Sequence, residues 1–105
     1  MSNGPVLNLE AYTSVSAQQT DSVLVASQDN KRIVVYQLYV SAVSDIVVTF
    51  KSGTTEVWRQ HVAAGGGSVV PFTGVEWFKT GKGVALTYST NGAVNVAVAL
   101  KGAAL

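Results

Sequence analysis

Side chains that could do chemistry are few in this 105-residue chain, and they are widely separated. The one histidine, His61, shares a short segment with Arg59 and Glu56. A histidine acting as general base needs a nucleophile to activate and a further group to orient it, and the neighbouring positions supply neither. We therefore predict a surface or interface position for His61 and no enzyme activity.

Metal binding is excluded by a similar argument. The chain has no cysteine and a single histidine, so a metal site would depend on carboxylates. These are scattered without ligand spacing, at Glu10, Asp21, Asp29, Asp45, Glu56 and Glu76. We predict no metal site, no disulfide and no cofactor.

Two glycine clusters superficially resemble phosphate-binding loops. The glycines at 65–67 precede a strand-like segment and no helix, and Gly81-Lys82-Gly83 lacks the following Ser or Thr of a phosphate loop. Both clusters are therefore predicted to be turns.

Two tryptophans remain as candidate binding residues. Trp58 alternates with polar neighbours, and Trp77 precedes Phe78 next to a turn. Either ring could fill the core, stack on a sugar or anchor a partner protein, because tryptophan is common in cores and at interface hot spots. The sequence leaves these alternatives open.

The composition favours a protein that works in an assembly. Charged residues make up 12% of the chain, about half the ~25% of ordinary soluble domains, and the net charge is +1. The alternative is that the many Ser and Thr residues keep an exposed face hydrated. The few scattered Lys and Arg argue against nucleic acid as a partner. No apolar run is long enough to span a membrane, and residues 1–20 lack a signal-peptide pattern, so we expect synthesis in the cytoplasm.

The secondary-structure elements that carry these residues must be strands, because valine dominates the apolar content and alternates with polar residues. The alternation predicts about eight short strands: 6–16, 21–27, 32–42, 46–51, 55–62, 68–72, 84–89 and 93–101. This pattern is typical of an all-β antiparallel β-sandwich, with a jelly roll as the leading topology and an immunoglobulin-like sandwich as the alternative. We expect an N-terminal arm over 1–9 and a single domain over 10–105. Asn91 followed by Gly92 predicts a two-residue hairpin turn.

The stretch 32–50 is the most continuously apolar part of the chain, and it reads as two neighbouring strands. Alternation in its first strand puts Val34, Tyr36, Leu38 and Val40 on one face, which we assign to the core. Ile33, Val35 and Tyr39 then lie on the opposite face, which is predicted to contact a neighbouring subunit.

Four segments, in order, resemble a set of structural proteins encoded by tailed phages. They are KRIVVYQLYVSA, VVTFKSG, AAGGGSVVPF and EWFKTGKGVALTYSTNGAVNVAVAL. The resemblance spans about Lys31 to Leu100 and is closest to jelly-roll head decoration (capsid cement) proteins. This chain departs from the pattern at Lys82, where the pattern has an acidic residue, and at Trp77, where it has a smaller apolar one.

The resemblance implies a homotrimer on the exterior of the virion that bridges subunits of the major capsid protein. The predicted subunit-interface residues are Ile33, Val35, Tyr39, Trp77 and Phe78. Capsid contact is assigned to Pro5, Val6 and Leu7 of the arm. The alternative function is a phage fibre or lectin-like domain that binds host glycans by stacking on Trp58 or Trp77.

Overall fold

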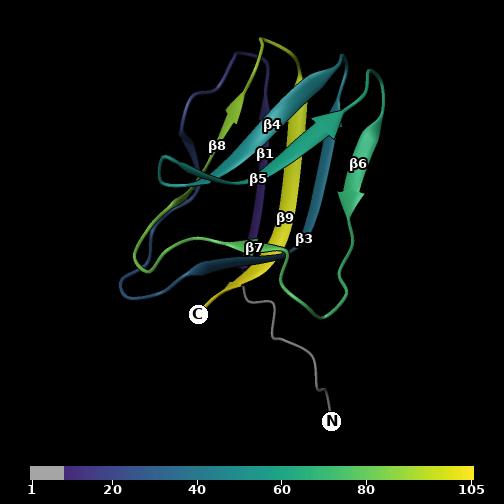
Figure 1. The fold of residues 1–105 in the computed structure, drawn as a ribbon. Helices are drawn as coiled ribbons and strands as arrows, with labels where there is room; N and C mark the ends of the chain where they lie inside the picture. Colours follow the sequence, from purple (N-terminus) through teal and green to yellow (C-terminus); the bar gives the residue numbers. More distant parts are fainter. Residues whose placement is uncertain (1–8) are drawn as a thin grey trace.

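The structure is a computed structural model that describes residues 9–105, which form strands and turns without a helix (Figure 1). The strands are β1 (Leu9–Val15), β2 (Ser22–Val25), β3 (Ile33–Ala42), β4 (Ile46–Ser52), β5 (Thr55–Val62), β6 (Gly67–Val70), β7 (Phe78–Lys79), β8 (Leu86–Thr90) and β9 (Val96–Ala104). They build two antiparallel sheets, so the predicted all-β sandwich is confirmed. Leu9, assigned to the arm, is the first residue of β1.

The strand order explains how the chain folds into two layers. Sheet A has the order β1-β9-β3-β6, with the short β7 also paired to β3, and sheet B has the order β2-β8-β4-β5. Strands from the first half of the chain pair with strands from the second: β1 with β9, β2 with β8, β3 with β6, and β4 with β5. This nested pairing corresponds to one long hairpin rolled into a barrel-like sandwich, the strand order of a jelly roll.

The nested pairing overrides the strongest local turn signal. Asn91 and Gly92 were predicted to join a hairpin, but β8 belongs to sheet B and β9 to sheet A, so the segment crosses between the sheets. Asn91 anchors this crossover to β4, because its side-chain oxygen accepts a hydrogen bond from the Val47 amide at 3.0 Å. The strands of 32–50 likewise lie in opposite sheets. A tight hairpin does join β4 to β5, through Gly53 at φ +64°.

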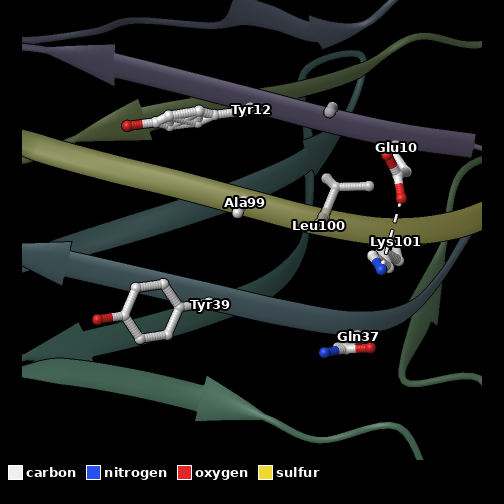
Figure 2. A pocket seen from close by; sticks show the side chains of 8 residues that line it. Glu10, Tyr12, Gln37, Tyr39, Ala99, Leu100 and Lys101 are labelled. Atoms are coloured by element: carbon white, nitrogen blue, oxygen red, sulfur yellow. Dashed lines mark ion pairs between the residues drawn. The ribbon is translucent and has the colours of Figure 1, made fainter.

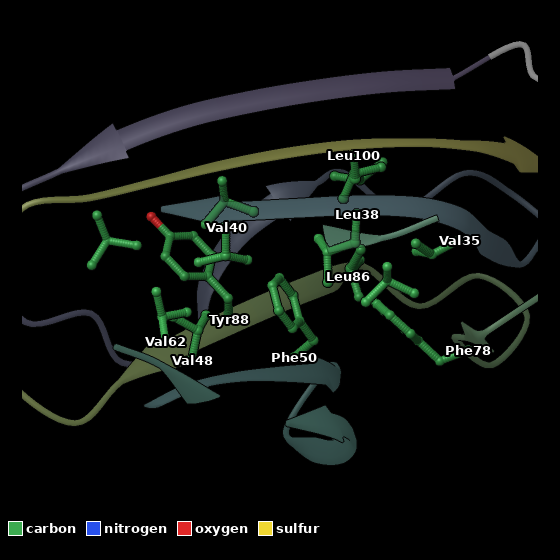
Figure 3. Packing of buried hydrophobic residues seen from close by; sticks show 14 of the residues in the cluster. Val35, Leu38, Val40, Val48, Phe50, Val62, Phe78, Leu86, Tyr88 and Leu100 are labelled. Atoms are coloured by element: carbon green, nitrogen blue, oxygen red, sulfur yellow. The ribbon is translucent and has the colours of Figure 1, made fainter. Parts of the chain in front are cut away.

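The main core lies between the two sheets (Figure 3). Sheet A contributes Val35, Leu38, Val40 and Leu100, and sheet B contributes Val48, Phe50, Leu86 and Tyr88. Ile33 also belongs to this core and is fully buried. The prediction that Ile33 and Val35 face outward to a neighbouring subunit is therefore wrong.

A β-bulge in β3 is the physical reason for this error. Val35 pairs with Gly102 and Gln37 with Lys101, so Tyr36 is an extra residue that has no partner on β9. A bulge shifts the alternation of a strand by one position. Ile33 and Val35 before the bulge therefore share the inner face with residues such as Leu38 after it.

The bulge brings two backbones unusually close together. A Cβ atom at Gly102 would lie 2.0 Å from the carbonyl oxygen of Val34, which no real side chain tolerates. Glycine at position 102 is therefore a requirement of the bulge, because only glycine permits such an approach.

Val34 and Tyr36 are buried on the opposite side of sheet A from the main core. They form a small cluster with Ala103, and the Phe72 ring from the segment between β6 and β7 lies 6.3 Å from the Tyr36 ring. The prediction that Val34 and Tyr36 fill the sandwich is thus wrong, although both side chains are buried. The outer face of sheet A is therefore covered by the chain itself around Tyr36, which we call its covered half, and is exposed around Tyr39, which we call its open half.

Candidate association surface

The open half of sheet A carries one row of side chains across four strands. The register places Tyr12 of β1 beside Ala99 of β9, Ala99 beside Tyr39 of β3, and Tyr39 beside Val69 of β6. Tyr12 is 66% exposed, Tyr39 44% and Val69 59%. We call these four residues the tyrosine row. Large apolar side chains exposed in line on neighbouring strands form a patch, which isolated surface residues do not.

The two tyrosine rings take different orientations (Figure 2). Seen from outside the sheet, the Tyr39 ring is face-on and the Tyr12 ring is edge-on. Gly67 makes room for the Tyr39 ring, because a Cβ atom at position 67 would lie 2.7 Å from the Tyr39 hydroxyl oxygen. The Tyr39 ring therefore lies over the sheet with one face uncovered.

A shallow trough of about 430 Å³ runs between the two rings, and Ala99 is among the residues that line it. Alanine alternates along the outward side of β9 at positions 97 and 99, so small side chains keep this strand low between its taller neighbours. Lys101 and Glu10 line the trough as well, with Nζ and Oε1 3.5 Å apart. The trough is open and mainly apolar, with a balanced pair of charges.

A second group of exposed apolar side chains lies on the segment 71–77, between β6 and β7. Phe72 is 44% exposed, Val75 66% and Trp77 37%, and we call these three residues the edge rim. In Figure 1 this segment descends from β6 and turns back to β7. Phe72 packs on Tyr36 of sheet A, whereas Trp77 packs on Trp58 of β5 in sheet B. The edge rim therefore crosses from one layer of the sandwich to the other.

Trp58 is part of an aromatic cluster that closes this edge. Its ring is stacked on Phe78 at 5.3 Å and meets Trp77 edge-on at 6.0 Å. Phe78 in turn lies 5.7 Å from Phe50 and is only 6% exposed. The prediction that Phe78 lies at a subunit surface is wrong, because its pairing with Val35 turns its side chain into the core.

The same cluster bears on the glycan-binding alternative. Stacking on a sugar needs an uncovered ring face and free hydrogen-bonding groups beside it. Trp58 has one face against Phe78, and its indole N–H donates to the Gln60 side-chain oxygen at 2.9 Å. The indole N–H of Trp77 donates to the Pro71 carbonyl at 2.8 Å. The structure brings the two tryptophans together in one packed cluster, in which Trp77 stays partly exposed.

The predicted interface residues thus separate into two groups. Tyr39 and Trp77 are at the surface, whereas Ile33, Val35 and Phe78 are in the core. Pro5, Val6 and Leu7, assigned to capsid contact, lie outside the described residues. The sequence did not single out Tyr12, Val69, Phe72 or Val75. For Tyr12 a signal existed, because its alternation with Leu9 and Ala11 placed it on the outer side of the first strand.

The remaining candidates for chemistry stay apart. His61 is exposed on β5, next to Val47 in the register. Among residues 9–105, no three His, Asp or Glu side chains gather in a way that could hold a metal ion. That same part of the chain holds no helix with the length and apolarity to cross a membrane.

Comparison with known proteins finds no family model that matches the chain, and no curated protein or solved structure that resembles it.

Proposed function

We propose that this chain is a structural virion protein, a trimeric head decoration protein that binds the exterior of a tailed-phage capsid and bridges subunits of the major capsid protein. The observation that carries the proposal is the tyrosine row, an uncovered aromatic stripe on a sandwich whose charged fraction is only 12%. Such a stripe is suited to contact with protein. The order of the segments that resemble phage decoration proteins supports the same role.

The mechanism is mechanical and involves no catalysis or cofactor. A decoration protein that bridges two capsid subunits must be displaced before the subunits can separate. Its displacement exposes buried apolar surface to water, at a free-energy cost of about 25 cal/mol per Å². Three linked copies also bind with a higher effective affinity than one, because the second and third contacts are intramolecular. The residues Pro5, Val6 and Leu7 stay the candidates for reaching the capsid.

Binding to capsids tests the proposal directly. Purified protein is mixed with expanded, undecorated heads of the phage that encodes it, and the heads are sedimented. We expect saturable co-sedimentation and a higher temperature of head disruption. Heads saturated beforehand with unlabelled protein serve as the control for non-specific binding. Absence of the protein from the head fraction, at concentrations where it is trimeric, would contradict the proposed function.

A further inference from the structure

We propose that the tyrosine row and the edge rim together form the surface through which copies of this chain pack around a three-fold axis. This inference rests on the proposed function, because it names the surface that would build the trimer. The occupant of the open half of sheet A is therefore a second copy of the same chain.

The exposed side chains of the tyrosine row and the edge rim supply a substantial part of the area that such a contact needs. An aromatic side chain offers about 200 Å², so the exposed fractions of Tyr12, Tyr39, Phe72 and Trp77 leave roughly 400 Å² uncovered. A stable interface buries about 800 Å² on each partner. In a contact between the tyrosine row of one copy and the edge rim of the next, the four rings supply about a quarter of the roughly 1,600 Å² buried on both partners together, before Val69, Val75 and the alanines of β9 are added. The largest apolar patch on a monomeric protein is typically about 300–600 Å² and is often functional, and the two patches together fall in this range.

The position of the two patches is suited to the ring that the proposed trimer requires. A two-fold dimer uses one patch that faces itself, whereas a ring joins two different patches of each copy. The tyrosine row lies on the outer face of sheet A, and the edge rim crosses toward sheet B, where Trp77 contacts Trp58. Each copy thus presents two patches on adjoining sides. We infer that the tyrosine row of one copy contacts the edge rim of the next.

The charges beside the two patches allow this contact. Glu10 and Lys101 form an ion pair beside the tyrosine row, and Glu76 and Lys79 form another, with Nζ and Oε1 3.1 Å apart, beside the edge rim. Each patch therefore carries one charge of each sign. Like charges brought together at an interface weaken it, and balanced pairs avoid this penalty.

The test is the mass of single-charge variants, measured by size-exclusion chromatography with light scattering. The wild-type chain is expected at about three times 11.0 kDa at micromolar concentration. Tyr12→Glu and Val75→Glu place an unpaired charge in the row and in the rim, and each is expected to weaken association at least 100-fold and give monomers. Val23→Glu is the matched control, because Val23 is 63% exposed on the outer face of sheet B. It should stay trimeric.

Circular dichroism and melting curves establish that the variants fold. Should Tyr12→Glu fail to fold, Tyr39→Ser removes the second ring of the row without adding charge, and should likewise release monomers. Trimers that survive both Tyr12→Glu and Val75→Glu would overturn the surface, and a dimeric wild type would overturn the ring.

Capsid binding measured on the same samples separates the two proposals. If the wild-type chain binds heads as a trimer, and the row and rim variants also stay trimeric, this surface is refuted and the proposed function stands. If the wild-type chain is monomeric and does not bind heads, both proposals are refuted. Calorimetry with maltotetraose, cellotetraose and chitotetraose tests a saccharide as the occupant of the trough. If the wild-type chain is monomeric and binds one of them, and Tyr39→Ser does not, the trough binds saccharide and the second copy is overturned as its occupant.

Discussion

The outer faces of the two sheets differ sharply, although both belong to one small sandwich. Sheet B presents Thr49 and Ser89 on its middle strands, with charged side chains around them, whereas Thr87 on the same face is buried. Two ion pairs lie on this side: Lys51 with Asp21 at 2.8 Å, and Arg59 with Glu56 at 2.7 Å. Sheet A presents tyrosine, alanine and valine in its open half.

The difference between the two faces lies in their aromatic side chains and not in the number of their charges. Each side of the sandwich carries two ion pairs. The large aromatic side chains that are exposed lie on sheet A and on its edge. Sheet A is therefore the face that is better suited to contact with protein.

The largest expected effect concerns the bulge that divides sheet A into a covered and an open half. Gly102→Ala places a Cβ atom 2.0 Å from the Val34 carbonyl oxygen, so the backbone of β3 or β9 must move. We expect a loss of about 3 kcal/mol or more in the free energy of unfolding. Melting curves should show Tm lower by roughly 10 °C or more.

Gly92→Ala is the matched control for this substitution. Gly92 has open space where a Cβ atom would stand, and its φ angle is not positive, so its unfolding free energy should change by less than about 0.5 kcal/mol. Equal stability of the two variants would mean that the bulge does not hold the two backbones as described.

The second-largest expected effect is a difference in unfolding free energy between variants of two tyrosines on β3. Tyr36 lies in the covered half of sheet A and is 8% exposed, whereas Tyr39 lies in the open half. Tyr36→Ala should cost about 2–3 kcal/mol in unfolding free energy, because a buried aromatic ring leaves a cavity. Tyr39→Ala should cost less than about 1 kcal/mol in the dissociated monomer.

Chemical denaturation at a series of protein concentrations measures this difference. Stability that depends on association rises with concentration, so the cost of Tyr39→Ala should grow as the wild-type chain assembles, and the cost of Tyr36→Ala should not. A concentration-independent cost for Tyr39→Ala as large as that for Tyr36→Ala would remove the distinction between the two halves.

The fold class could be predicted from the sequence because alternation and valine content act locally. Strand positions such as Ile46, Val48 and Phe50 face the core as their alternation predicts. Pairing could not be predicted, because it depends on strands distant in the chain. Asn91 followed by Gly92 is a local hairpin signal, and the nested pairing of β8 and β9 with other strands outweighed it.

The candidate surface could be predicted only in part, for a similar reason. Alternation after the bulge gave the correct outward position for Tyr39, and alternation before it gave the wrong one for Val35. The bulge depends on a glycine in β9, more than 60 residues away in the sequence, so no pattern within β3 could reveal it. A row of side chains across four strands is likewise invisible until the strand order is known.

The smallest expected effect concerns the ion pairs of the two faces. Lys51 and Asp21 on sheet B are partly buried, with side chains 22% and 37% exposed, whereas Lys101 and Glu10 on sheet A are both more than half exposed. Lys51→Ala should therefore cost about 0.5–1 kcal/mol in unfolding free energy, and Lys101→Ala close to none. Because salt screens charges, the loss in Lys51→Ala should shrink in 1 M salt, where the screening length falls to ~3 Å. If Lys101→Ala proves the more costly variant, the charge beside the tyrosine row has a structural role in the monomer. The contrast between the outer faces of sheet A and sheet B would then be weaker than the exposure of their side chains indicates.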